Sequence, residues 1–119
     1  PNNDCSITVK NVSGAYKISK VTYKPSSSAA EEDYIDVLFE PCEKDDVYTF
    51  KNDKTYQISD NGSVCTPSSS DVGTWDVDFL GLIIDGSAAF GKYDCKTLEL
   101  TTFNTQVSGD QLKITMTRL

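Results

Sequence analysis

The sequence DVYTFKNDKTYQISDNG, residues 46–62, carries the strongest evidence on the fold class. Apolar and polar residues alternate over 46–51 and again over 55–60, with a break at Asn52-Asp53 between them. Strict alternation is typical of strands that bury one face, and Asn61-Gly62 is a strong turn signal. We therefore expect two antiparallel strands joined by a short turn. Their shared inward face holds Tyr48, Phe50, Tyr56 and Ile58.

Similar segments recur on both sides of this stretch, each bounded by glycine, proline, serine, asparagine or aspartate. Further strands are expected over residues 12–24, 73–79, 82–85, 87–95, 97–103 and 111–118. The first strand is long and mixed in pattern, so we expect it to bend, and residues 29–39 form either a short helix or an irregular loop. Eight strands with short connections predict an all-β protein, an eight-stranded antiparallel up-and-down barrel. Residues 1–11 are expected to form an N-terminal arm, and residues 12–119 a single barrel domain.

The composition excludes several classes of function. The chain has 119 residues with 18 acidic and 11 basic side chains, a net charge of −7 and no histidine. Nucleic acids and anionic membranes select basic surfaces, so neither is expected as a partner. The absence of histidine rules out a Ser-His-Asp triad, and no apolar run is long enough to span a bilayer. We expect no cofactor, no metal and no enzymatic activity.

Four cysteines, Cys5, Cys42, Cys65 and Cys95, are spread along the chain, and the nearest two are 23 positions apart. Zinc sites use closely spaced cysteine pairs, so this pattern favours two disulfides over a metal site, with free buried thiols as the other alternative. Three connectivities are open. Disulfides indicate an oxidising compartment. Because the sequence starts at Pro1 without methionine, we expect a mature fragment of an exported protein, whether periplasmic, cell-surface or secreted, with a segment upstream of Pro1 as a candidate anchor.

Other residues point to a family. PCEKDDVYTF, residues 41–50, is similar to a signature of bacterial lipocalin-like domains, and Tyr56, Cys65 and Gly73-Thr74-Trp75 follow in the family's order. The resemblance is densest over residues 42–79 and continues more weakly over 14–119. It implies a calycin-type barrel in secreted or lipoprotein-related bacterial proteins, most of them uncharacterised.

The resemblance also implies roles for particular residues. It suggests the pair Cys42–Cys65, with Cys5 and Cys95 as an added pair, Cys5–Cys95. Arg118, the only arginine, stands where related barrels place an arginine over a tryptophan ring at the base. Tyr16 occupies that aromatic position here, so we expect a structural cation–π contact between Arg118 and Tyr16.

Two groups of carboxylates are candidate chemical sites. Glu40, Glu43, Asp45 and Asp46 could bind calcium, but they lack the spacing of a known loop and fit capping roles better. Asp76 and Asp78 have a spacing compatible with paired-carboxylate hydrolysis. On the outer face of a strand, however, they are more simply solvated surface residues.

The remaining candidate site is the barrel interior. Its expected aromatic lining is Tyr16, Tyr48, Phe50, Tyr56, Trp75 and Phe79. Such a lining predicts non-catalytic binding of a small hydrophobic ligand by a monomer. Alternatively the rings fill the barrel, and the domain binds a protein partner, as a protease inhibitor or a cell-envelope component. An exposed apolar patch near residues 80–82 or 34–39 would favour that alternative.

Overall fold

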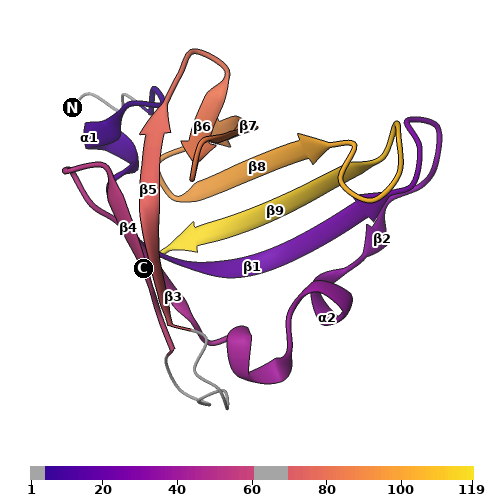
Figure 1. Cartoon of the computed structure of the whole chain (residues 1–119), viewed down its shortest axis with the longest axis horizontal. Coiled ribbons are helices and arrows are strands. Elements are labelled where there is room, and N and C mark those ends of the chain that lie inside the picture. The colour runs from indigo at the N-terminus through magenta and orange to yellow at the C-terminus, as the bar shows by residue number, and fades with distance from the viewer. Residues whose placement is uncertain (1–4, 61–69) are drawn as a thin grey trace.

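The alternating segments form one closed antiparallel barrel in a computed structural model that describes residues 5–60 and 70–119. β1 pairs with β3, each later strand pairs with the next, and β9 returns to β1 to close the wall (Figure 1). The barrel strands are β1 (Gly14–Lys24), β3 (Val47–Phe50), β4 (Thr55–Ser59), β5 (Asp71–Val77), β6 (Gly81–Ile84), β7 (Ser87–Tyr93), β8 (Thr97–Phe103) and β9 (Gln111–Arg118). The predicted eight-stranded up-and-down barrel is confirmed.

Three short elements occupy the chain between β1 and β3. They are β2 (Glu32–Asp33), α2 (Ile35–Leu38) and the 3₁₀-helix η1 (Pro41–Glu43). β2 extends the sheet beside the far end of β1, at Thr22 and Tyr23. A helix therefore does form within residues 29–39, but it is a single turn. It ends there because Pro41 favours an extended Glu40, whose ψ is 158°.

β1 is the longest strand and contacts both halves of the molecule. β9 pairs with β1 from Tyr16 to Lys24, whereas β3 pairs only with the first three residues of β1. The irregularity expected in its middle is a register shift between Ile18 and Lys20. A bulge of this kind bends a strand, so the far ends of β1, β8 and β9 extend beyond β3 and β4 (Figure 1).

The described part of the N-terminal arm packs against the barrel. Thr8 caps α1 (Val9–Val12) by accepting a hydrogen bond from the Asn11 amide at 3.0 Å. Ile7 and Val9 lie against the core, and Val12 is fully buried within it. None of the helices in the described part of the chain has the length and apolar character that a membrane span requires.

The core occupies the inside of the barrel and contains residues from most strands. Its buried members are Val12, Tyr16, Phe50, Tyr56, Trp75, Leu82, Leu98, Leu100 and Met116. Phe50 packs between two other rings: its centroid lies 5.7 Å from that of Tyr16 and 5.1 Å from that of Trp75. Near Trp75 the interior is thus filled by aromatic side chains.

Candidate functional site

The base of the barrel is closed by Arg118 stacked on Tyr16. The guanidinium carbon lies 5.0 Å from the centre of the Tyr16 ring, so the expected cation–π contact is present. Gly14, the first residue of β1, leaves space for this contact and has a φ of +149°. A Cβ at Gly14 would overlap the Arg118 guanidinium. The Gly14-x-Tyr16 spacing therefore places a ring and a vacant Cβ position beside one arginine.

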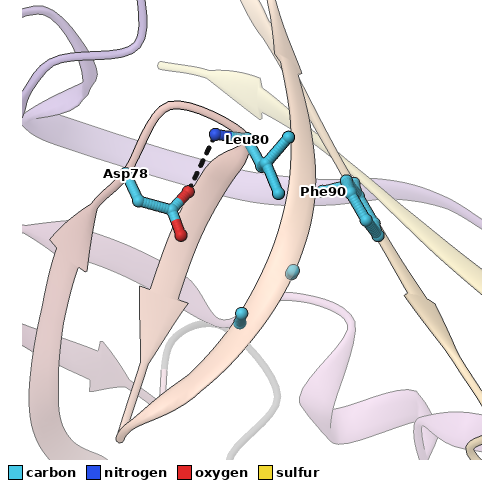
Figure 2. A pocket seen from close by; sticks show the side chains of 5 residues that line it. Asp78, Leu80 and Phe90 are labelled. Carbon is cyan, nitrogen blue, oxygen red and sulfur yellow. Dashed lines mark hydrogen bonds between the residues drawn. The ribbon is translucent and has the colours of Figure 1, made fainter.

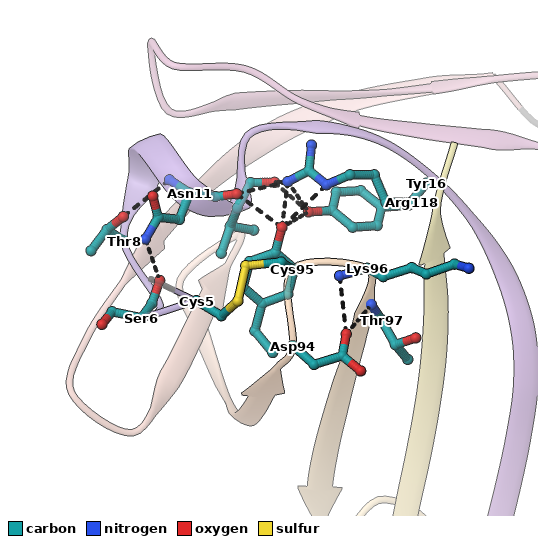
Figure 3. Close-up of a disulfide and its surroundings, with 12 residues drawn as sticks. Cys5, Ser6, Thr8, Asn11, Tyr16, Asp94, Cys95, Lys96, Thr97 and Arg118 are labelled. Carbon is teal, nitrogen blue, oxygen red and sulfur yellow. Dashed lines mark hydrogen bonds between the residues drawn. A yellow bond between two sulfur atoms is a disulfide. The ribbon is translucent and has the colours of Figure 1, made fainter. Parts of the chain in front are cut away.

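Arg118 also holds the N-terminal segment in place. Its guanidinium donates to the carbonyl oxygen of Asn11 at 2.7 Å and to the Tyr16 hydroxyl at 2.8 Å (Figure 3). It also donates to the carbonyl oxygen of Ser13 at 3.0 Å. Burial, reinforced by a hydrogen bond with Tyr93, raises the pKa of Tyr16 well above its usual range. The base thus combines a neutral phenol, Tyr16, with a cation, Arg118, that is hydrogen-bonded to main-chain oxygens. This arrangement fits a structural role, and we call the Arg118–Tyr16 pair the seal of the barrel base.

A disulfide lies next to this seal. Cys5 and Cys95 are bonded, with their Cα atoms 5.1 Å apart (Figure 3). Asp94 shapes the turn that carries Cys95 by accepting hydrogen bonds from the amides of Lys96 and Thr97. The other suggested pair, Cys42–Cys65, lies outside the described residues, because Cys65 falls within 61–69.

A cavity of about 90 Å³ lies inside the barrel. It is lined by Tyr48, Phe50, Tyr56, Ile58, Ile84 and Met116. These side chains come from β3, β4, β6 and β9, strands that lie around the barrel rather than on one side of it. The cavity therefore belongs to the interior of the barrel, and Phe50 both lines it and contacts Trp75.

Two phenols supply the polar character of the cavity wall. The Tyr56 hydroxyl donates to Asp85, whereas within the described residues the Tyr48 hydroxyl makes no hydrogen bond. Burial, together with the nearby carboxylates of Asp46 and Glu43, raises the pKa of Tyr48 to about 12. Burial, with the hydrogen bond to Asp85, raises the pKa of Tyr56 to about 12. Both hydroxyls are therefore neutral at physiological pH.

The six aromatic residues expected in the interior are divided among three places. Tyr48, Phe50 and Tyr56 line the cavity, and Tyr16 and Trp75 fill the core beside it. The placement of Phe79 was wrong: its side chain is 94% exposed. β5 ends at Val77, and Asp78 then accepts hydrogen bonds from the amides of Leu80 and Gly81, so Phe79 lies at the tip of a turn rather than in a strand.

Three residues of the cavity wall were missing from the predicted lining: Ile58, Ile84 and Met116. Their positions agree with the alternation in β4, β6 and β9, which already placed Ile58 on an inward face. The selection of aromatic residues alone left them out. The period-2 pattern, applied to every apolar residue, would have found them.

Asp76 and Asp78, the candidate carboxylate pair, take part in an ion pair and in turn hydrogen bonds. Asp76 forms an ion pair with Lys54 at 3.2 Å, and Asp78 caps the β5–β6 turn. Beside that turn lies a hollow of about 40 Å³, bounded by Asp78, Leu80 and Phe90 (Figure 2). Pockets for drug-sized ligands reach about 300 Å³ or more, so this hollow is far too small for such a ligand. Among the described residues no group of three His, Cys, Asp or Glu side chains is placed to hold a metal ion.

Comparisons with known proteins agree with this geometry. A protein-family model described as a lipocalin-like domain matches residues 12–114. Searches of curated proteins and of solved structures returned no significant match. The matched segment begins at the last residue of α1 and ends within β9, so it covers seven barrel strands in full and the first half of β9. The chain belongs to the family of lipocalin-like domains.

Proposed function

We propose that this domain binds a small apolar ligand, without catalysis, in the cavity between Phe50 and Met116. The observation that carries the proposal is the cavity itself, with four aliphatic or phenyl side chains and two neutral phenols on its wall. Sites of this composition bind ligands by apolar contact and orient them through a few polar groups. The Tyr48 hydroxyl is available for that orienting hydrogen bond.

The volume sets the size of the ligand. An apolar cavity of about 150 Å³ holds benzene, and pockets for drug-sized molecules reach about 300 Å³ or more. The cavity here is about 90 Å³. It therefore suits the apolar end of a ligand, with the remainder extending towards the barrel mouth, or a ring that enters when Tyr48 moves aside.

We also propose that the domain works outside the cytoplasm. The Cys5–Cys95 disulfide supports this, because disulfides persist in oxidising compartments and are rare in the cytosol.

Binding is tested by titrating the protein with benzene, indole and a short-chain fatty acid. The single tryptophan, Trp75, is the reporter, since its ring contacts Phe50 and Phe50 lines the cavity. We expect saturable fluorescence changes for at least one of the probes, and Ile84→Phe, which fills the cavity, abolishes them.

Ile83→Phe is the matched control. Ile83 is the neighbour of Ile84 on β6 but faces an outer groove with Lys54 and Asp76. Binding should be unchanged in this variant. Equal loss in both variants, or no saturable signal with any probe in the wild type, would contradict the proposal.

A further inference from the structure

The net charge of the protein is concentrated in one segment. Residues 31–46 contain eight carboxylates and one lysine, a net charge of −7, which equals the charge of the whole chain. The other 103 residues carry ten charges of each sign. The barrel is therefore balanced, and the acidic character of the protein comes from the connection between β1 and β3, here called the acidic connection (residues 31–46).

The acidic connection also exposes apolar side chains. On α2, Val37 is 68% exposed and Leu38 is 38% exposed. Glu32, Asp33 and Glu40 flank them as exposed carboxylates. Surfaces that combine apolar side chains with one sign of charge are typical of interaction sites, because apolar contact supplies affinity and charge selects the partner.

The barrel holds this segment in a fixed place. The Tyr34 amide donates to the carbonyl oxygen of Val21 at 2.9 Å, and the Tyr34 ring lies 4.8 Å from that of Tyr23. Gln106, from the β8–β9 loop, donates to the Tyr34 hydroxyl at 2.8 Å. Tyr34 thus anchors the start of α2, while Val37 and Leu38 face away from the barrel. Figure 1 shows α2 on the flank below β1 and β2, far from α1.

Ion pairs with two lysines offset part of this charge. Lys44 pairs with Asp36, and Lys113 of β9 lies 3.6 Å from Glu31. These two lysines offset two carboxylates. Asp46 is buried, whereas the side chains of Glu32, Asp33 and Glu40 are exposed, so the field of these three is directed at solvent. Such a field attracts cations and repels acidic proteins and anionic membranes.

We propose that the acidic connection is a docking surface for a basic, amphipathic polypeptide segment. Leucine-like side chains of the partner cover Val37 and Leu38, and its lysines or arginines face Glu32, Asp33 and Glu40. One helical turn offers a small contact area, so the complex is transient and weakens with salt. This role is separate from ligand binding in the barrel cavity.

The test uses a synthetic amphipathic helix of leucine and lysine and follows the amide NMR signals of the protein. We expect chemical-shift changes confined to residues 31–46 and their neighbours on β1 and β9. Affinity should fall severalfold between about 50 and about 300 mM NaCl. Spermine, which is cationic but lacks an apolar face, should bind much more weakly.

Matched variants separate location from bulk charge. Glu32→Gln with Glu40→Gln should weaken peptide binding about tenfold. Asp71→Asn with Asp76→Asn makes the same change in net charge on β5 and should leave affinity within about twofold. Val37→Ser should also weaken binding severalfold, whereas Val72→Ser, at a site 73% exposed, should not.

Three results would overturn the proposal. One is a set of shift changes centred elsewhere, for instance at Leu80 and Phe90. Another is equal weakening by the two charge pairs or by the two valine variants. The third is spermine binding as tight as that of the peptide. Peptide binding should persist in Ile84→Phe, so failure of the cavity proposal is distinguishable from failure of this one.

Discussion

Removing the Cys5–Cys95 disulfide should cost more stability than any other single change at the barrel base. The bond joins residues 90 positions apart. In the chain-entropy model, closing a loop of this length lowers the entropy of the unfolded chain and raises its free energy by about 4.5 kcal/mol at 25 °C. We expect Cys5→Ser with Cys95→Ser to lose between about 3 and 4.5 kcal/mol of unfolding free energy, because engineered and native bonds commonly deliver less than the model.

The backbone at Cys95 gives a second, opposite contribution. Its φ is +75°, a left-handed conformation that costs a residue with a Cβ about 1 kcal/mol and costs glycine almost nothing. Once the bond is absent, Cys95→Gly should therefore be more stable than Cys95→Ser by about 1 kcal/mol. Comparing the two double variants, each with Cys5→Ser, isolates this backbone term.

The assay is equilibrium unfolding in urea under non-reducing conditions, followed by Trp75 fluorescence, with Cys42 and Cys65 left intact. The urea dependence (m-value) should rise in both variants, because an uncrosslinked unfolded chain exposes more surface. A loss below about 1 kcal/mol would refute the entropic reasoning. A serine variant as stable as the glycine variant would refute the assignment of backbone strain.

Three further changes test other parts of the structure. Arg118→Met removes the cation that joins Tyr16 to the N-terminal carbonyl oxygens and should lower the unfolding free energy by about 3 kcal/mol, measured by thermal unfolding. Arg118→Lys lacks the planar guanidinium with its several donors and should recover less than half of that loss. Burial alone would raise the pKa of Asp110. Hydrogen bonds outweigh this effect and hold the pKa far below its usual range; they come from the Val107 amide, the Tyr23 hydroxyl and the amides of Gln106 and Thr105. The ionised form of Asp110 is therefore stabilised in the folded protein. The wild type should therefore be more stable than Asp110→Asn at pH 7 and should lose this advantage as the pH falls below about 4, which urea unfolding at several pH values measures; a constant difference would exclude this linkage. Gly81→Ala would place a Cβ against the β7 backbone at Ala89 and Gly91 and should lower the unfolding free energy by about 3 kcal/mol. In Gly86→Ala the new Cβ meets open space, so the loss should be about 1 kcal/mol from the positive φ alone. Equal losses in the two variants would argue against the close strand contact.

The strand pattern was predictable because alternation reports burial on one face. All eight barrel strands were found from sequence, including the long first strand with its irregular middle. Phe79 shows where this reasoning fails. The alternation of Trp75 and Val77 continues through Phe79 in sequence, but the local hydrogen bonds of Asp78 end the strand first. A capping side chain outweighs a periodic pattern at a strand end.

The cavity was not predictable from sequence. Whether six rings fill a barrel or leave space depends on how Phe50, Tyr16 and Trp75 pack together, which is a property of three-dimensional distances. The α1 segment was missed for a related reason. Thr8 caps α1 locally, but the position of α1 against the barrel depends on Arg118, more than a hundred residues away in sequence.

The pairing of β1 with β9 bears on how the protein is made. These two strands form eight residue pairs, and they lie at opposite ends of the domain. Folds dominated by such distant contacts fold in milliseconds to seconds rather than microseconds. On the ribosome, β1 emerges first and must wait for the last strand to be synthesised, with an open edge that other chains are able to join. Nascent and truncated chains that lack β9 should therefore be the species most prone to aggregation.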